Sequence, residues 1–247
     1  MIVKFLFMDE KYADQRAPPN ARAISLTGLL VPATAHPEFR RQYYELLTVA
    51  LGATRTEIPA IPPIHAASLL PDATDDVRCA FLEGIVSIIC QLGFRAYRIG
   101  YLKTPEIMNA FKSEKPVVGL CFSGILSCIV PELATSTVWP VMETDGSEIQ
   151  DRAFAGSMQF VDYATPLLGP GNITINNENL GEVLYTRKRS AHGTVVDCVS
   201  YLLHLRWLRS IGQTQTPYKK RLADIAEGLM PAVAYDKVIR MRFHKAP

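Results

Sequence analysis

The stretch IVKFLFMDE, residues 2–10, decides how the chain begins to fold: an apolar run broken only by Lys4 ends in two acids. Its β-branched and aromatic residues are typical of a buried strand. We therefore predict a strand over residues 2–8, with Asp9 at its end and at the rim of a sheet. A carboxylate in such a place has to be solvated, paired or bound to a cation, because an unpaired buried charge costs several kcal/mol. Asp9 is accordingly either a cap of the following loop or a ligand.

The composition is that of an ordinary globular protein of 247 residues, with 48% hydrophobic and 20% charged residues. This length accommodates one large domain or two small ones. The five cysteines are odd in number and widely spaced, which indicates neither a disulfide framework nor a zinc site and favours a reducing, cytoplasmic location. The N-terminal apolar run is too short for a signal peptide. The longest apolar stretch, residues 117–130, has fourteen residues, too few to span a bilayer, and is expected to form a buried core helix.

Positive charge is concentrated in the last quarter of the chain. Residues 187–247 hold twelve Lys or Arg against four Asp or Glu, whereas the rest of the chain is net acidic. Such asymmetry favours the attraction of a polyanion such as nucleic acid to one end of the molecule. The alternative is a solvated helix face whose bases serve solubility. We expect no membrane partner and no small organic cofactor, and the sequence carries no signal for the oligomeric state.

Apolar periodicity predicts strands and helices that alternate along the chain. Beyond the first strand, we expect strands at residues 23–31, 94–101, 136–143, 173–175 and 182–186. Helices are expected at residues 38–51, 72–92, 105–111, 117–132, 148–163 and 194–208. This interleaving indicates an α/β or mixed-sheet single domain.

Three carboxylates occupy unusual places in this pattern. Asp9 ends the first strand, Asp145 follows a later strand, and Asp197 lies among apolar residues too far inside a helix to cap it. A salt bridge to Arg187 or Arg189 is one interpretation of Asp197. The other is that the three acids share Mg²⁺ or Mn²⁺, hard cations that prefer carboxylate oxygens. Two such ions about 4 Å apart can activate water and stabilise the leaving oxygen of a phosphodiester.

Three short motifs resemble those of a known family. FMDE at residues 7–10 is similar to the family's opening (F/Y)xDE, IHAASL at residues 64–69 to its H-A-x-x-L stretch, and VDCVSY at residues 196–201 to its closing A-D-x-x-A-Y. In this order, and over about residues 2–205, they resemble the domain of unknown function 3800. That family is similar in fold to ribonuclease H and retroviral integrases.

The resemblance implies an α/β fold with a ribonuclease-H-like mixed sheet of about five strands flanked by helices. It implies one such domain over residues 1–209, with an extra helical insertion at about 53–134, and a basic C-terminal extension, 210–247, packed on the same domain. Acids from the first strand, the fourth strand and the last helix of the matching region would meet at the end of the sheet. Carried over to this sequence, these acids are Asp9, Asp145 and Asp197.

The sequence departs from the family pattern beside the proposed site. The family usually reads Asp-Glu-Ser-Gly where this chain has DEKY at residues 9–12, which places a cation and a bulky ring there. Before the last acid it commonly has Ile-Gln, where this chain has Gly193 and Thr194. Both changes bear on whether the site is fully active.

The remaining candidate residues are less certain members of such a site. A fourth acid has no clear counterpart; Glu143 and Glu57 are candidates, whereas Glu10 alternates with Asp9 and should point to the opposite face of its strand. His65 is either a substrate- or water-positioning group or a residue that packs its proline-rich loop.

The function expected from these features is a metal-dependent nuclease that hydrolyses phosphodiester bonds in DNA or RNA. Arg187, Lys188 and Arg189 would bind phosphates. The alternative is a catalytically degenerate nucleic-acid- or protein-binding module of a mobile-element or phage-defence system, because fold alone does not choose between the two. A third reading, an unrelated small-molecule hydrolase, would depend on His65 alone.

Overall fold

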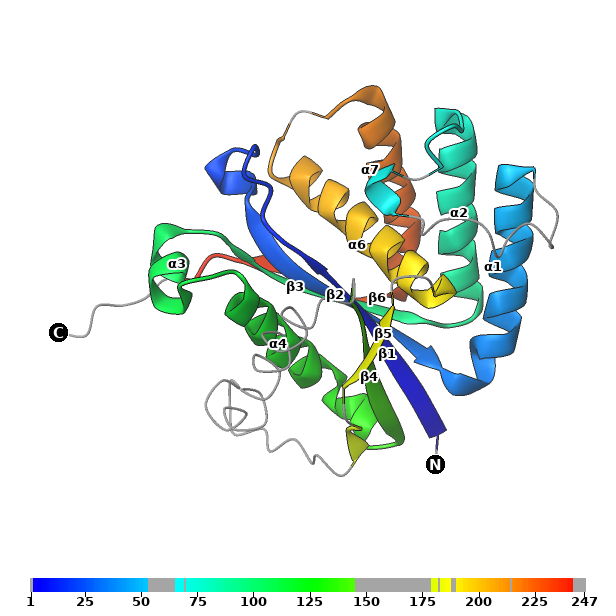
Figure 1. Cartoon of the computed structure of the whole chain (residues 1–247), viewed down its shortest axis with the longest axis horizontal. Helices are drawn as coiled ribbons and strands as arrows, with labels where there is room; N and C mark the ends of the chain where they lie inside the picture. The colour runs from blue at the N-terminus through cyan, green and yellow to red at the C-terminus, as the bar shows by residue number, and fades with distance from the viewer. Residues whose placement is uncertain are drawn as a thin grey trace.

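The structure, a computed structural model, contains one mixed sheet with helices on both of its faces (Figure 1). It describes residues 2–52, 65–68, 70–144, 179–181, 183–187, 190–213 and 215–241. The predicted helix at 148–163 and the predicted strand at 173–175 lie outside these residues.

Six strands form the sheet in the order β5-β4-β1-β2-β3-β6. The first three strands are neighbours joined in antiparallel fashion, β4 runs parallel to β1, β5 parallel to β4, and β6 parallel to β3. The mixed α/β class is therefore as predicted, with one strand more than the expected five. The strands are β1 (Ile2–Lys11), β2 (Ala23–Pro32), β3 (Arg95–Leu102), β4 (Ser136–Thr144), β5 (Leu184–Arg187) and β6 (Val233–Ile239).

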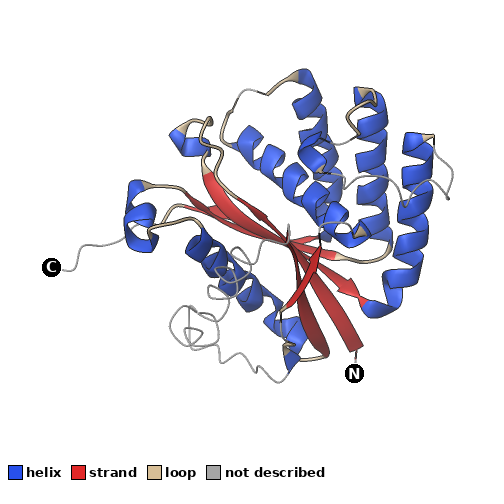
Figure 2. Ribbon diagram, viewed as in Figure 1, coloured by secondary structure: helices blue, strands red, loops and turns tan. Residues whose placement is uncertain are grey.

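Helices cover the sheet on both sides, as Figure 2 shows. One face carries α1 (His36–Leu51), α2 (Asp75–Gln91), α6 (Ala191–Ser210) and α7 (Pro217–Leu229). The other carries α3 (Pro105–Phe111) and α4 (Lys115–Leu133). Short 3₁₀ turns are η1 (Pro19–Ala21), η2 (Ala33–Ala35), η4 (Ala66–Ser68) and η6 (Met230–Ala232). Helix α6 lies directly on β1, β2 and β3, with α7 and α2 packed beyond it.

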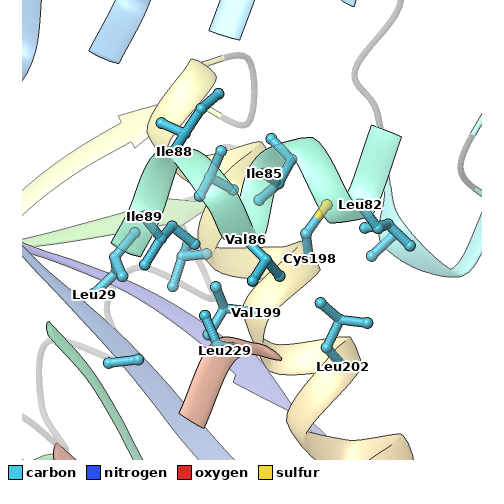
Figure 3. Close-up of a cluster of buried hydrophobic side chains, with 14 of the residues drawn as sticks. Leu29, Leu82, Ile85, Val86, Ile88, Ile89, Cys198, Val199, Leu202 and Leu229 are labelled. Atoms are coloured by element: carbon cyan, nitrogen blue, oxygen red, sulfur yellow. The ribbon is translucent and has the colours of Figure 1, made fainter. Parts of the chain in front are cut away.

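Two hydrophobic clusters, one on each face, hold the layers together. Figure 3 shows part of the larger one, in which apolar side chains of α2, α6 and the end of α7 meet Leu29 of β2. Full burial of a side chain of this size contributes about 1.5–3 kcal/mol. The clusters separate odd from even positions of β1, because Phe7 belongs to the first and Leu6 and Met8 to the second.

Helix α4 forms the core of the opposite face. It spans 19 residues and extends the predicted helix 117–132 at both ends, and it is the one helix among the described residues with the length and composition to cross a membrane. Half of it is buried, and it packs against β2, β3 and β4, as expected of a core helix. The approach is close because Gly124 faces the sheet: a Cβ there would lie 2.6 Å from Cδ1 of Ile99.

Strand β1 is longer than predicted. Antiparallel pairing with β2 continues to the pair Lys11 and Ser25, so Asp9 lies within the strand opposite Thr27. The prediction that Asp9 ends the strand is therefore wrong, because the strand continues to Lys11. Strand β2 provides hydrogen-bond partners for the backbone N–H and C=O groups of the polar residues at the end of β1. This pairing outweighs the weak intrinsic preference of those residues for strands.

Two parts of the chain contribute strands that their expected roles did not include. Residues 53–134, expected as a helical insertion, supply β3, which lies between β2 and β6 in the sheet. Residues 210–247, expected as a packed extension, supply α7, which packs on α6 and α2, and β6, which pairs with β3. The C-terminal residues are thus part of the main sheet.

Candidate functional site

Asp9 of β1 and Asp197 of α6 face the same interval between strand and helix. Phe7 stacks on His192 with ring centroids 4.2 Å apart, and the ammonium of Lys11 lies 5.9 Å from the ring centroid of Tyr201. Asp9 lies between the two contact residues of β1, and Asp197 lies between the two contact residues of α6. Four strand residues and nine helix residues both span about 13 Å, so the two acids lie at comparable heights. Side-chain alternation puts Asp9 on this face together with Phe7 and Lys11.

The electrostatics of Cys198 agree with this placement. Its thiol is completely buried, and burial raises its pKa well above the ordinary value. The carboxylates of Asp197 and then Asp9 raise it further. Both acids therefore act on one buried thiol from opposite sides of the strand–helix interface.

Asp197 is also tied to the turn that carries His65. Its Oδ2 accepts the backbone N–H of Ala66 at 3.1 Å, and Nδ1 of His65 lies 3.6 Å from the same oxygen. Oδ1 accepts no hydrogen bond from the described part of the chain. The side chain is 28% exposed and that of His65 is 53% exposed. A half-buried carboxylate therefore lies beside an accessible imidazole.

A positive charge lies on the other side of Asp197. Tyr201, one helical turn on from Asp197, carries the Lys11 ammonium over its ring, and His204 follows on the same side of α6. Burial lowers the pKa of His204 to about 3, with further lowering by the charges of Lys11, Arg98 and Lys219. His204 is therefore neutral at physiological pH, and Lys11 supplies a positive charge on the same face of β1 as Asp9.

A row of polar residues crosses the sheet beneath α6. In register, Asp9 pairs with Thr27, Thr27 with Arg98, and Arg98 with Asp236. The guanidinium of Arg98 is 2% exposed and is held by Asp236 at 2.6 Å, and Arg206 of α6 approaches the second oxygen of Asp236 at 3.6 Å. Sequence reasoning missed this row, although a charged residue at position 98 between buried Tyr97 and Ile99 was a usable signal.

The remaining predicted site residues are placed only in part. Glu143 lies in β4 one residue after Met142, which pairs with Met8, and Arg187 lies at the end of β5 beside Thr144. The side chains of these two residues are outside the described part. Glu10 falls on the α4 face with Leu6 and Met8, opposite to Asp9, as predicted. The candidates that lie wholly outside the described residues are Asp145, Glu57, Lys188 and Arg189.

Metal-ligating side chains do not gather in threes within the described ranges: no group of three His, Cys, Asp or Glu residues there could hold an ion. Asp9 and Asp197 supply two carboxylates on facing elements. The predicted third, Asp145, follows the last described residue of β4.

Several arginines of the basic C-terminal quarter serve structure. Arg206 pairs with Glu227 and Asp236, Arg209 with Asp224 and Glu227, and Arg221 with Asp76 of α2. Such ion pairs join α6, α7 and α2 but contribute little each where they are exposed. Within the described residues of α7 and after it, the exposed bases left for a polyanion are Lys219, Lys220, Lys237 and Arg240.

A stack of aromatic rings supports the start of α6 next to the site. The ring of His192 is 3% exposed and lies against Phe7, Phe39 and His36, whose Nδ1 is 3.3 Å from Nε2 of His192. Burial lowers the pKa of His192 to about 3, and His36 and Arg40 lower it further. The folded protein therefore holds this ring neutral.

This stack makes stability depend on pH. In the unfolded chain His192 is protonated below about pH 6.5, whereas in the folded chain it is protonated only near pH 3. The contribution of the neutral ring to the free energy of unfolding is therefore full above pH 6.5 and is lost as the pH falls toward 3. We expect the free energy of unfolding to drop by on the order of 2 kcal/mol from this ring between pH 7.5 and pH 5. His192→Phe, which retains an aromatic ring on Phe7, should show a smaller drop in urea unfolding. Equal drops in both proteins would contradict this assignment.

Comparison of the chain with protein-family models, with curated proteins and with solved structures found no match. The resemblance to the domain of unknown function 3800 therefore stays a prediction from the three motifs. The site has to be interpreted from its own geometry.

Proposed function

We propose that the chain is a divalent-metal-dependent nuclease that hydrolyses phosphodiester bonds in DNA or RNA. The observation that carries the proposal is the facing of Asp9 and Asp197 across β1 and α6. The strand order supports it, because β4 lies next to β1 and parallel to it, and α6 lies over β1. A ribonuclease-H-like site would take acids from the first strand, the fourth strand and a covering helix, and Asp145, which follows β4 in the sequence, would be the acid of the fourth strand.

The donor set fits Mg²⁺ or Mn²⁺. Asp9 and Asp197 offer carboxylate oxygens, the ligands that these hard cations prefer, and no described residue donates a hydrogen bond to the Oδ1 atom of Asp197. When bound, the cation would activate a water molecule and offset the negative charge that develops on the phosphate. In the hydrolysis, an oxygen–phosphorus bond forms to water and the bond to the leaving oxygen breaks. The water loses a proton and the leaving oxygen gains one.

The chain's own residues would hold and orient these groups. The Ala66 N–H fixes Oδ2 of Asp197, and Oδ1 would be the oxygen that binds the cation. His65 is accessible beside it and can accept the proton released by water or contact the phosphate. Thr27 and Arg98 close the floor of the site under α6, where the charge of Arg98 is already matched by Asp236.

The proposal is tested by incubating single-stranded, duplex and hybrid nucleic acids with the protein and Mg²⁺ or Mn²⁺. We expect metal-dependent cleavage by the wild type and a loss of at least about a hundredfold in Asp9→Asn, since each 1.4 kcal/mol of lost transition-state stabilisation is tenfold in rate. Glu83→Gln, which neutralises an exposed acid on α2, is the matched control and should cleave like the wild type. Absence of any metal-dependent product, or equal rates for the wild type and Asp9→Asn, would contradict the nuclease and favour a binding module.

A further inference from the structure

Lys11 stands out because its charge is placed beside the two acids yet is bound to neither. It follows Asp9 by two residues on the same face of β1. Its half-buried side chain reaches the ring of Tyr201, 5.9 Å from the centroid. Within the described part of the chain, its ammonium forms no ion pair with a carboxylate. A cation–π contact holds the group in place without neutralising it.

The surroundings of Lys11 separate it from the other base on this face. Arg98 is neutralised by Asp236, whose Oδ1 accepts a hydrogen bond from its Nε and forms an ion pair with its Nη2. Among the described residues Lys11 has no such partner, and its charge helps to lower the pKa of His204. Lys11 is therefore a positive charge on the face of Asp9 that no carboxylate of the described residues pairs with.

An unmatched ammonium in this interval has two consequences. It repels a second divalent cation, because like charges a few ångströms apart in a partly buried site interact strongly. It also supplies what a second cation would supply, namely a positive charge and hydrogen-bond donors for a phosphate oxygen. Two divalent cations together with Lys11 would carry more positive charge than the carboxylates of Asp9 and Asp197 balance.

We propose that Lys11 takes the place of a second metal ion, so that the site binds one divalent cation and holds the substrate phosphate between that cation and the ammonium. This inference rests on the proposed nuclease function. Asp9 and Asp197 hold the cation, and Lys11 donates a hydrogen bond to a non-bridging phosphate oxygen without losing its proton. Tyr201 sets the position of the ammonium, and the substrate class is a phosphodiester.

The test is the number of Mn²⁺ ions bound per chain, measured by calorimetry and by the electron spin resonance of free Mn²⁺. We expect one ion for the wild type, and in Lys11→Gln either a second ion or an affinity for the first that is higher by on the order of fivefold. Lys11→Arg, which retains the charge, should bind as the wild type does. Lys112→Gln, which removes an exposed charge at the end of α3 on the opposite face of the sheet, is the matched control and should also be unchanged. Circular dichroism verifies that each variant is folded.

The cleavage assay adds a second readout. Lys11→Gln should raise the KM for nucleic acid by on the order of tenfold. Lys11→Arg, which retains the charge, should have a KM close to that of the wild type. Two ions per wild-type chain, or unchanged Mn²⁺ binding and KM in Lys11→Gln, would overturn the inference about Lys11 while cleavage itself continues. Absence of both Mn²⁺ binding and cleavage in the wild type would instead overturn the proposed function, and the two failures are therefore distinguishable.

Discussion

Replacement of Asp236 by alanine is expected to lower the free energy of unfolding by about 3–5 kcal/mol, because it leaves a buried charge without its partner. The guanidinium of Arg98 is 2% exposed, and its Nε and Nη2 atoms both lie 2.6 Å from the Oδ1 atom of Asp236. Burial holds the pKa of Arg98 below its ordinary value, and only Asp236 opposes that effect. The nearest other base, Arg206, adds like charge once Asp236 is removed.

Urea unfolding at neutral pH measures this effect, and a double variant separates the charge from the packing. Arg98→Met combined with Asp236→Leu removes both partners and replaces them with apolar groups of similar volume. Its free energy of unfolding should lie within about 1–2 kcal/mol of that of the wild type, and should therefore be higher than that of Asp236→Ala. A double variant as unstable as Asp236→Ala would show that the shape of the pair, and not its charge, is what the fold requires.

Replacement of Asp197 by asparagine is expected to reduce metal-dependent cleavage by at least about a thousandfold, because a metal ligand contributes several kcal/mol to the transition state. Asparagine has the volume of aspartate and an oxygen that can still accept the N–H of Ala66. The charge that holds the cation is lost, while the link to η4 is retained. Stability should change little, since the carboxylate is 28% exposed.

Asp197→Ala separates the two roles of this carboxylate. It should lose activity as Asp197→Asn does, but it should also accelerate amide hydrogen exchange at Ala66, because the N–H of that residue loses its acceptor. Cleavage rates and exchange rates of the two variants give the comparison. Activity in Asp197→Asn within tenfold of the wild type would contradict a metal role for Asp197 and leave it the structural role of holding the turn.

Local signals in the sequence predict most element boundaries of this fold. Gly52 and Gly93 directly follow the predicted helices 38–51 and 72–92, and they take positive φ values of 61° and 67° after α1 and α2. Ser190 precedes α6 and accepts the N–H of Gly193 at 2.9 Å as its N-cap. Capping and left-handed stops depend on a few neighbouring residues, so they can be identified without knowledge of the tertiary fold.

The site was only partly predictable, because some of its contacts have local signals in the sequence and others do not. The face of Asp9 follows from alternation in β1, and the burial of Asp197 follows from its apolar neighbours on α6. The contact of Asp197 with His65 and Ala66 depends on how η4 packs against α6 across 131 residues of chain. The pairing of Arg98 with Asp236 spans 138 residues and depends on β6 taking the place next to β3. Long-range packing of this kind has no local signature.

The position of β6 in the sheet has a consequence for the order in which the molecule assembles. Arg98 is synthesised 138 residues before Asp236, and until that acid arrives, its guanidinium is more stable in water than under α6. The inner face of β3 therefore closes late, after α7 has been made, and the hairpin of β1 and β2 is the part of the sheet that can form early. Closing so long a loop is slow, and its rate sets the speed at which the floor of the site is completed.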